Sequence, residues 1–144
     1  MTLPIKTNSY DYKYNKTLNE DVKLTSDEYG DWDLDMDNGD YINTTGLVTL
    51  NNACIIAIMT RFGELIGNPT YGEFGCHVHE LIKDNKTKLT LYKLETDIKE
   101  VLDKMRRISQ VNFVKISEYD AHSYLVKFGV TSINDEMVEG SVTL

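Results

Sequence analysis

The chain has 144 residues, 41% of them hydrophobic, and a formal net charge of −8, which is the composition of a folded domain and not of a disordered chain. The charge excess lies in one segment, because nine carboxylates and a single lysine fall between Glu20 and Asp40. Nucleic acid needs clustered Lys and Arg, so it is a poor candidate partner, and a basic protein surface is a better one.

The first 30 residues mix Tyr, Asn, Lys and Thr without a sustained period of 2 or 3.6, which predicts an extended N-terminal arm. Residues 31–144 are then expected to form a single domain. At its start, Trp32, Leu34 and Met36 alternate with aspartates. This period of 2 predicts a half-buried strand, ended by a turn at residues 37–40.

The alternating aspartates also raise a calcium-stabilised binding module as an alternative. An EF-hand loop needs oxygen ligands at its first, third and fifth positions, glycine at the sixth and glutamate at the twelfth. The alternating aspartates are Asp31, Asp33, Asp35 and Asp37. Whether the loop is started at Asp31 or at Asp33, its sixth position is not glycine and its twelfth is not glutamate. The strand interpretation is therefore favoured.

Residues 50–62 predict a short buried helix that is capped by Asn51 or Asn52 and ended by Gly63. Its apolar residues at helical spacing are Ile55, Ile56, Met59 and Phe62, and Ile58 widens the surface. The segment 63–75 that follows holds four glycines and one proline, so we expect an irregular loop that is functional or buried against a partner.

Residues 77–84 predict one or two helical turns, and Lys88–Ser109 predicts a long amphipathic helix. The apolar stripe of the long helix consists of Leu91, Leu94, Ile98, Val101, Leu102, Met105 and Ile108. Arg106 and Arg107 would lie at the negative end of its dipole.

The remaining chain predicts an antiparallel meander of three strands, Val111–Tyr119, Ser123–Thr131 and Met137–Leu144, with one edge of the sheet unpaired. One apolar face of the sheet is formed by Tyr124, Val126, Phe128 and Val130. The predicted fold class is thus α+β, with two main helices, one short and buried and one long and amphipathic, packed on a small C-terminal sheet.

Metal-binding candidates are few. Cys54 and Cys76 are too few for a disulfide scaffold or zinc ribbon, and we expect both to be small buried hydrophobes. Beside Cys76, His77 and His79 stand two positions apart, so on a helix they would diverge, and no second pair of ligands is apparent. Neither this cluster, which includes Glu80, nor the rest of the chain predicts a metal or a cofactor.

Catalytic candidates are also few. Glu64 and Glu73 could serve as the paired carboxylates of a peptidoglycan-cleaving enzyme, but nothing in the sequence builds an apolar pocket around either. His122 falls in a hairpin connection, and no serine or cysteine lies in a nucleophile motif. We expect no enzyme. No apolar stretch suits a membrane span or a secretory signal, so we also expect no membrane partner.

Residues 55–82 resemble the baseplate wedge and tail-sheath initiator family of contractile phage tails and related injection systems. The matching parts are a short apolar helix ending in Thr60, the pair Gly63 and Glu64, a turn at Pro69, the pair Tyr71 and Gly72, and a second apolar helix with Val78, Leu81 and Ile82. Many members carry proline after the threonine and arginine after the glutamate, where this chain has Arg61 and Leu65. The resemblance covers about Trp32 to Leu144.

The resemblance implies a structural protein of the virion, assembled in the host cytoplasm and located in the tail baseplate. Its fold would resemble the C-terminal domain of the sheath protein. Its partners would be baseplate wedge proteins and the tail sheath or tube, with several copies in a ring, and it would template sheath assembly by β-strand addition. The expected partner-binding residues are Thr60, Gly63, Glu64, Pro69, Tyr71, Gly72, Tyr124, Val126, Phe128, Val138, Val142 and Leu144.

Overall fold

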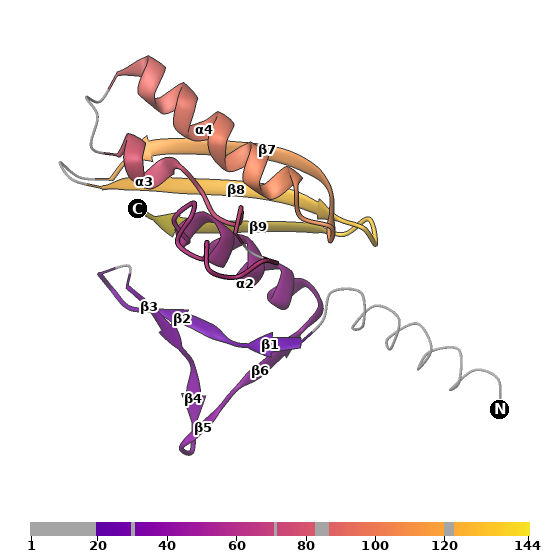
Figure 1. Ribbon diagram of the computed structural model, residues 1–144. Helices are drawn as coiled ribbons and strands as arrows, with labels where there is room; N and C mark the ends of the chain where they lie inside the picture. The colour runs from indigo at the N-terminus through magenta and orange to yellow at the C-terminus, as the bar shows by residue number, and fades with distance from the viewer. Residues whose placement is uncertain (1–19, 30, 71, 83–86, 120–122) are drawn as a thin grey trace. The chain divides into compact units, whose positions relative to one another are not determined.

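The computed structural model describes residues 20–29, 31–70, 72–82, 87–119 and 123–144 (Figure 1). The chain divides into two compact units, Met1–Asn52 and Ala53–Leu144, and the division falls inside helix α2 (Gly46–Met59). No helix in the described ranges is both long and apolar enough to cross a bilayer. Most of the predicted N-terminal arm, residues 1–19, lies outside the described residues, and the single domain over 31–144 stays a prediction.

In its described residues the first unit contains three short antiparallel strand pairs (Figure 1), followed by the start of α2. They are β1 (Glu20–Val22) with β6 (Asn43–Thr45), β2 (Leu24–Ser26) with β3 (Trp32–Leu34), and β4 (Met36–Asp37) with β5 (Asp40–Tyr41). Residues 20–26, predicted as part of the arm, therefore form strands. Asn38 and Gly39, with φ of 50° and 80°, make the predicted turn, because a tight hairpin turn of this kind requires positive φ at both central residues.

The three strand pairs meet at a junction of three residues that are bonded in a cycle. The Lys23 N–H donates to the Ile42 carbonyl (2.7 Å), the Ile42 N–H to the Asp35 carbonyl (3.2 Å), and the Asp35 N–H to the Lys23 carbonyl (2.8 Å). The Lys23 ammonium also pairs with the Asp35 carboxylate at 3.1 Å. The cycle satisfies main-chain groups at the point where every strand pair ends.

The junction corrects the prediction of one half-buried strand over residues 31–37. Asp35 breaks that strand into β3 and β4, because its main chain bonds to Lys23 and Ile42 instead of continuing a ladder. Trp32 is half-buried, but Leu34 and Met36 are exposed. The alternation of apolar residues and aspartates thus runs through β3 and β4, which belong to different strand pairs.

Helix α2 begins at Gly46, five residues before the expected cap. Asn52, predicted as a cap, lies inside the helix, where it is buried and donates from Nδ2 to the Val22 carbonyl (3.2 Å). The predicted apolar stripe is also wrong, since Ile56 and Met59 are exposed and Phe62 follows the end of the helix. The buried residues of α2 include Leu50, Cys54, Ile55, Ala57 and Ile58.

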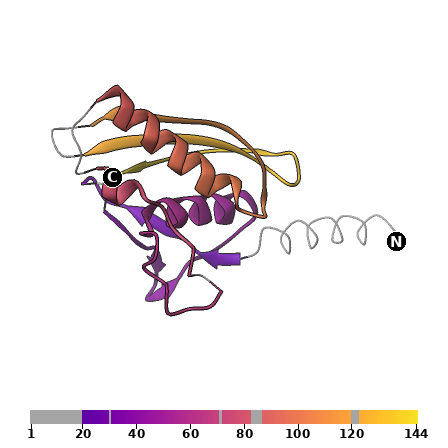
Figure 2. The same cartoon turned by 45° about the horizontal axis from the view of Figure 1, so that its top comes forward.

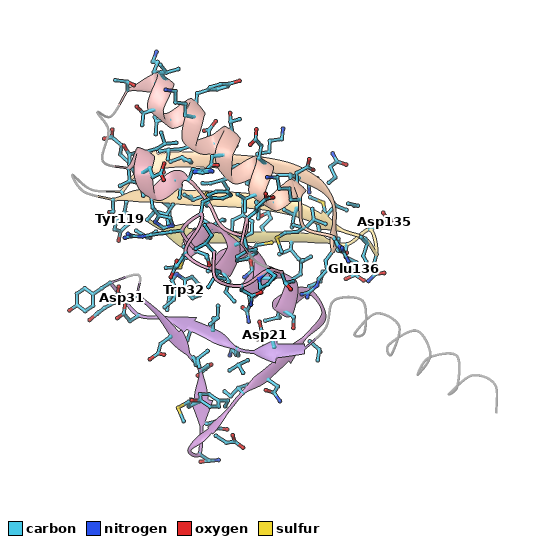
Figure 3. The ribbon with its side chains drawn as sticks, in the orientation of Figure 1. Asp21, Asp31, Trp32, Tyr119, Asp135 and Glu136 are labelled. Atoms are coloured by element: carbon cyan, nitrogen blue, oxygen red, sulfur yellow. The ribbon has the colours of Figure 1, made fainter. Side chains whose placement is uncertain are left out.

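The second unit contains the three-stranded antiparallel sheet in the order β7-β8-β9. Its strands are β7 (Ile108–Glu118), β8 (Tyr124–Ser132) and β9 (Met137–Thr143), each within three residues of the predicted limits. Figure 3 shows Asp135 and Glu136 at the turn between β8 and β9, and Tyr119 at the opposite end of the sheet. The α+β class with a C-terminal antiparallel sheet is confirmed.

One face of this sheet forms the core, as predicted. Tyr124, Val126, Phe128 and Val130 of β8 are at most 1% exposed, and β9 adds Val138 and Val142. Helix α4 (Lys88–Asp103) packs along β7 and buries Leu94, Ile98 and Leu102 (Figures 1 and 2). The short helix α3 (Val78–Leu81) contacts α4 and buries Val78, which confirms the predicted helical turns at this place.

The long helix starts where predicted and ends early. Thr87 is its cap, with a side chain that accepts from the Thr90 N–H, but the helix stops at Asp103 and β7 starts at Ile108. Arg106 and Arg107 consequently lie in the connection and not in the last helical turn. The buried stripe is reduced to every fourth residue, as expected for a helix on one face of a sheet.

Two leucines on α4 allow a matched test of this packing. Leu94 is fully buried and Leu89 is 61% exposed, so Leu94→Ala should lower the free energy of unfolding by roughly 2–5 kcal/mol. Leu89→Ala should change it by less than about 0.5 kcal/mol. Urea unfolding followed by circular dichroism measures both, and similar losses in the two variants would contradict this arrangement of α4.

Candidate partner-binding site

The loop formed by residues 61–75, here called the 61–75 loop, is closed at its base by main-chain bonds. The Cys76 N–H donates to the Thr60 carbonyl (2.8 Å), and the Phe62 N–H donates to the Cys76 carbonyl (3.1 Å). These bonds form a parallel bridge between Arg61 and Cys76. The Phe62 ring stacks on the His77 ring, with the ring centroids 4.1 Å apart. The two ends of the loop are thus held together by side chains as well as by main-chain bonds.

Within the loop, consecutive turns replace regular structure. Glu64 turns back on itself, because its N–H donates to the Arg61 carbonyl (3.1 Å) while its Oε2 accepts from the Arg61 N–H (3.1 Å). Both bonds thus use the main chain of Arg61. Further turns join Gly63 to Ile66 and Leu65 to Asn68.

The 61–75 loop is exposed over most of its described length, so burial against a partner stays a prediction. Arg61, Phe62, the stretch 64–70 and Glu73 are exposed, and Ile66 is 78% exposed. A base fixed by main-chain bonds combined with exposed apolar side chains is a feature of binding loops carried by a scaffold.

The predicted partner residues of this region sit at different places along the loop. Thr60 ends α2 with its hydroxyl donating to the Ile56 carbonyl (2.7 Å), and Gly63 has a φ of 80°. Glu64 and Pro69 are exposed and Gly72 is half-buried, whereas Tyr71 lies outside the described residues.

Gly75 holds the loop against its own base. Its φ is 117°, and an added Cβ would lie 2.6 Å from the Arg61 carbonyl oxygen. The next residue, Cys76, is buried and donates from Sγ to the Asp97 Oδ2 of α4 (3.0 Å). The prediction that Cys54 and Cys76 are buried is confirmed.

The histidines next to Cys76 make separate contacts. His77 Nδ1 lies 3.9 Å from Glu80, while His79 Nε2 lies 3.2 Å from the Ile58 carbonyl. Among the described residues, no three His, Cys, Asp or Glu side chains are grouped so that they could hold a metal. This statement includes the aspartates of residues 31–37, while His122 lies outside the described ranges.

Of the two candidate catalytic carboxylates, Glu64 is engaged with the Arg61 N–H. Glu73 is exposed and borders a cavity of about 190 Å³ whose other lining residues are Phe74, Gly75, Val101, Lys104 and Met105. The two glutamates therefore lie in different surroundings, and these surroundings do not mark them as a catalytic pair.

The predicted partner residues of the C-terminal sheet belong to its core. Tyr124, Val126, Phe128, Val138 and Val142 are all buried. Leu144 is half-buried and exchanges main-chain bonds of 2.8 Å with Tyr124. A partner therefore cannot reach these side chains while the sheet is folded, and would have to use the main chain of an edge strand.

The edge of β9 presents such main-chain groups. Leu144 pairs with Tyr124, and the Glu136 carbonyl accepts a hydrogen bond from the Ser132 N–H, so the even-numbered residues between Glu136 and Leu144 bond to β8. The N–H and C=O groups of Met137, Glu139, Ser141 and Thr143 consequently point away from β8. Across the described parts of the chain, β9 pairs with no strand other than β8.

The opposite edge of the sheet is less open. Helix α4 runs along β7 and leaves a groove of about 550 Å³ between them. Its lining includes Tyr92, Glu95, Thr96, Lys99, Phe113, Val114 and Lys115. An extended chain would meet α4 there, whereas Met137, Glu139 and Ser141 of β9 have exposed side chains.

Fold and edge together define an α+β protein with an accessible strand edge. No family model matches the chain, and no curated protein matches it either. Its fold is similar to that of a crystal structure from Geobacter sulfurreducens that carries the provisional name tail lysozyme. The two share 21% sequence identity, the TM-score is 0.56, and the match covers 66% of this chain and 86% of that one.

Replacing Gly75 tests the closure of the 61–75 loop. Gly75→Ala should lower the free energy of unfolding by about 1–3 kcal/mol, because φ is positive and the new Cβ meets the Arg61 carbonyl. Amide exchange of Phe62 and Cys76 should quicken as the base loosens. Gly67→Ala, where a Cβ meets open space, should stay within about 0.5 kcal/mol of wild type. Equal effects of the two substitutions would refute a strained closure at Gly75.

The buried thiols predict an alkaline loss of stability. Burial raises the pKa of Cys54 to about 12, partly offset by the Arg107 charge, and burial with the Asp97 hydrogen bond raises the pKa of Cys76. Above pH 9, the ordinary value, an unfolded thiol releases its proton while the folded one keeps it, so stability falls as pH rises toward 12.

The Cys54→Ala variant isolates this effect. Its packing cost is independent of pH, so it appears as a constant offset from wild type at pH 6–8. Above pH 9 the stability of wild type should fall more steeply, by up to about 1.4 kcal/mol per pH unit. Urea unfolding at a series of pH values measures the difference, and parallel curves up to pH 11 would contradict a raised thiol pKa.

Proposed function

We propose that this chain is a non-enzymatic structural protein of a phage tail or related contractile injection device, located in the baseplate. It links the baseplate wedge to the sheath or tube and templates sheath assembly. The fold shared with the Geobacter protein, whose name refers to a tail, supports this setting. The open edge of β9 is the observation that carries the mechanism.

Strand addition at β9 is the proposed templating step. An extended arm of a sheath subunit would bond to the outward N–H and C=O groups of the odd-numbered residues 137–143. These main-chain hydrogen bonds would give the affinity and set the register of the added strand. Side chains of the added strand would alternate between the core side and the uncovered side of the sheet. Because each sheath subunit needs the same template, several copies would form a ring.

The 61–75 loop is the proposed contact with the wedge. Its base is fixed by the Thr60, Phe62 and Cys76 main-chain bonds, while Leu65 and Ile66 remain exposed. Burying such apolar side chains in a partner gains roughly 25 cal/mol per Å², and a rigid loop loses little entropy when it binds. The loop and the β9 edge would then hold two different partners.

Proline at position 141 tests strand addition without cutting the sheet. Ser141 directs its N–H away from β8, so Ser141→Pro removes an outward donor and keeps every β8–β9 bond. Ser141→Ala retains the N–H and is the matched control. We expect wild type and Ser141→Ala to speed the polymerisation of the sheath subunit from the same tail, and Ser141→Pro to do so at least about tenfold less.

Light scattering and electron microscopy would follow this polymerisation, and thermal unfolding would verify that all three proteins fold. Equal nucleation by Ser141→Pro and wild type would rule out the β9 edge as the template. No nucleation by any of the three would refute the templating role.

A further inference from the structure

The face of the C-terminal sheet opposite the core carries a row of polar side chains across three strands. Lys115 of β7 pairs in register with Lys127 of β8, which pairs with Ser141 of β9. Both lysines are exposed, and within the described chain neither has a carboxylate within 4.0 Å. Like charges directly opposite each other on neighbouring strands repel, so a carboxylate that binds near the two lysines would relieve this repulsion.

Next to this row the same face is hollowed and partly apolar. The Phe113 ring lies over Gly129, where an added Cβ would come within 2.4 Å of the ring, and Lys115 is 5.7 Å from the ring centroid. A groove of about 330 Å³ is lined here by Phe113, Lys127, Glu139 and Ser141, among others. A ligand with paired carboxylates could therefore seat against both the lysines and an apolar wall.

The chain itself carries a matching group in the β4–β5 hairpin. Asp37 and Asp40 are cross-strand partners beside the Asn38–Gly39 turn, just as Lys115 and Lys127 are cross-strand partners on the sheet. Cross-strand Cβ atoms lie about 4.5–5.5 Å apart, so the two aspartates and the two lysines have a similar spacing at their Cβ atoms.

The hairpin is also accessible. Met36 and Tyr41, the neighbouring cross-strand pair, are 53% and 52% exposed, and both aspartates are exposed. Asp37 and Asp40 belong to the segment 20–40, which carries the whole net charge of −8, while the rest of the chain is balanced. The aspartate pair of the hairpin and the lysine pair of the sheet are therefore complementary in charge.

We propose that the uncovered face of the C-terminal sheet binds the β4–β5 hairpin of a second copy, with Asp37 and Asp40 against Lys115 and Lys127. The two surfaces differ, so the contact is heterologous and its repetition generates a ring or an open chain of copies. The inference stands apart from the proposed tail role, because it uses the face of the sheet and not the β9 edge.

Sedimentation velocity of the full chain over a concentration series tests the contact. Wild type should self-associate at low salt and dissociate at high salt. Two double variants, Lys115→Glu with Lys127→Glu and Asp37→Asn with Asp40→Asn, should each weaken association by about tenfold or more. Asparagine can still accept the Tyr41 N–H that Asp40 accepts, so the hairpin is retained.

Mixing the two variants gives the decisive result. The lysine variant keeps an intact hairpin and the aspartate variant keeps an intact face, so an equimolar mixture should form one-to-one dimers and no larger species. As a matched control, Lys88→Glu with Lys93→Glu makes the same change of charge at exposed positions of α4 that do not line the groove with Lys115, and should leave association near wild type.

Thermal unfolding would verify that every variant is folded. A wild type that stays monomeric throughout the low-salt series would overturn the proposal. So would two variants that associate as well as wild type, or a mixture without dimers, which would point to a different acidic partner or to a self-contact elsewhere. Sheath nucleation by Ser141→Pro is a separate measurement, so each proposal can fail while the other holds.

Discussion

The inward orientation of the even-numbered residues of β8 is the constraint on which the second unit depends. Because Tyr124, Val126, Phe128 and Val130 are buried, the odd-numbered residues of β8 must lie on the other face. The regular pairing with residues 113–118 of β7 and with β9 extends this choice over the sheet. It puts Lys127 opposite Lys115 outside the core, and it leaves room at Gly129 for the Phe113 ring. A shift of one residue would reverse every one of these positions.

The same constraint explains how far the sequence predicts the second unit. Its elements are periodic and local, so the strands, the start of α4 and the core face of β8 could all be derived from spacing. The end of α4 could not, because Met105 and Ile108 keep the helical spacing while the chain already turns into β7. The family resemblance also implied a partner surface at apolar residues of the sheet, although apolar alternation in a strand chiefly identifies its core side. The accessible β9 groups follow from main-chain bonding, which side-chain spacing does not reveal.

The first unit was predicted poorly for a physical reason. Its strands have two or three residues, too few for a period to stand out, and β1 pairs with β6 across more than twenty residues. The hydrogen bonds that close the cycle of Lys23, Asp35 and Ile42 are main-chain bonds, which any residue type could make, and only the Lys23–Asp35 ion pair adds a side-chain contact. Likewise, Asn52 carries the signal of a helix cap, but its amide is used inside α2 to reach the Val22 carbonyl. In both cases a distant contact outweighs the local preference.

The edge and the face of the C-terminal sheet would bind through different interactions, main-chain hydrogen bonds at the edge and charge on the face. They would therefore select different kinds of partner. Main-chain bonds at the β9 edge are available to almost any extended segment, so they give affinity with little dependence on salt or on residue identity. The Lys115 and Lys127 pair acts through charge, which salt screens over about 8–10 Å and which discriminates strongly between acidic and basic ligands. Glu139 and Ser141 border both regions, since their main chains point along the edge while their side chains belong to the face. A strand added at β9 would therefore extend the charged face by one strand, and a ligand on that face would contact both the original sheet and the added chain.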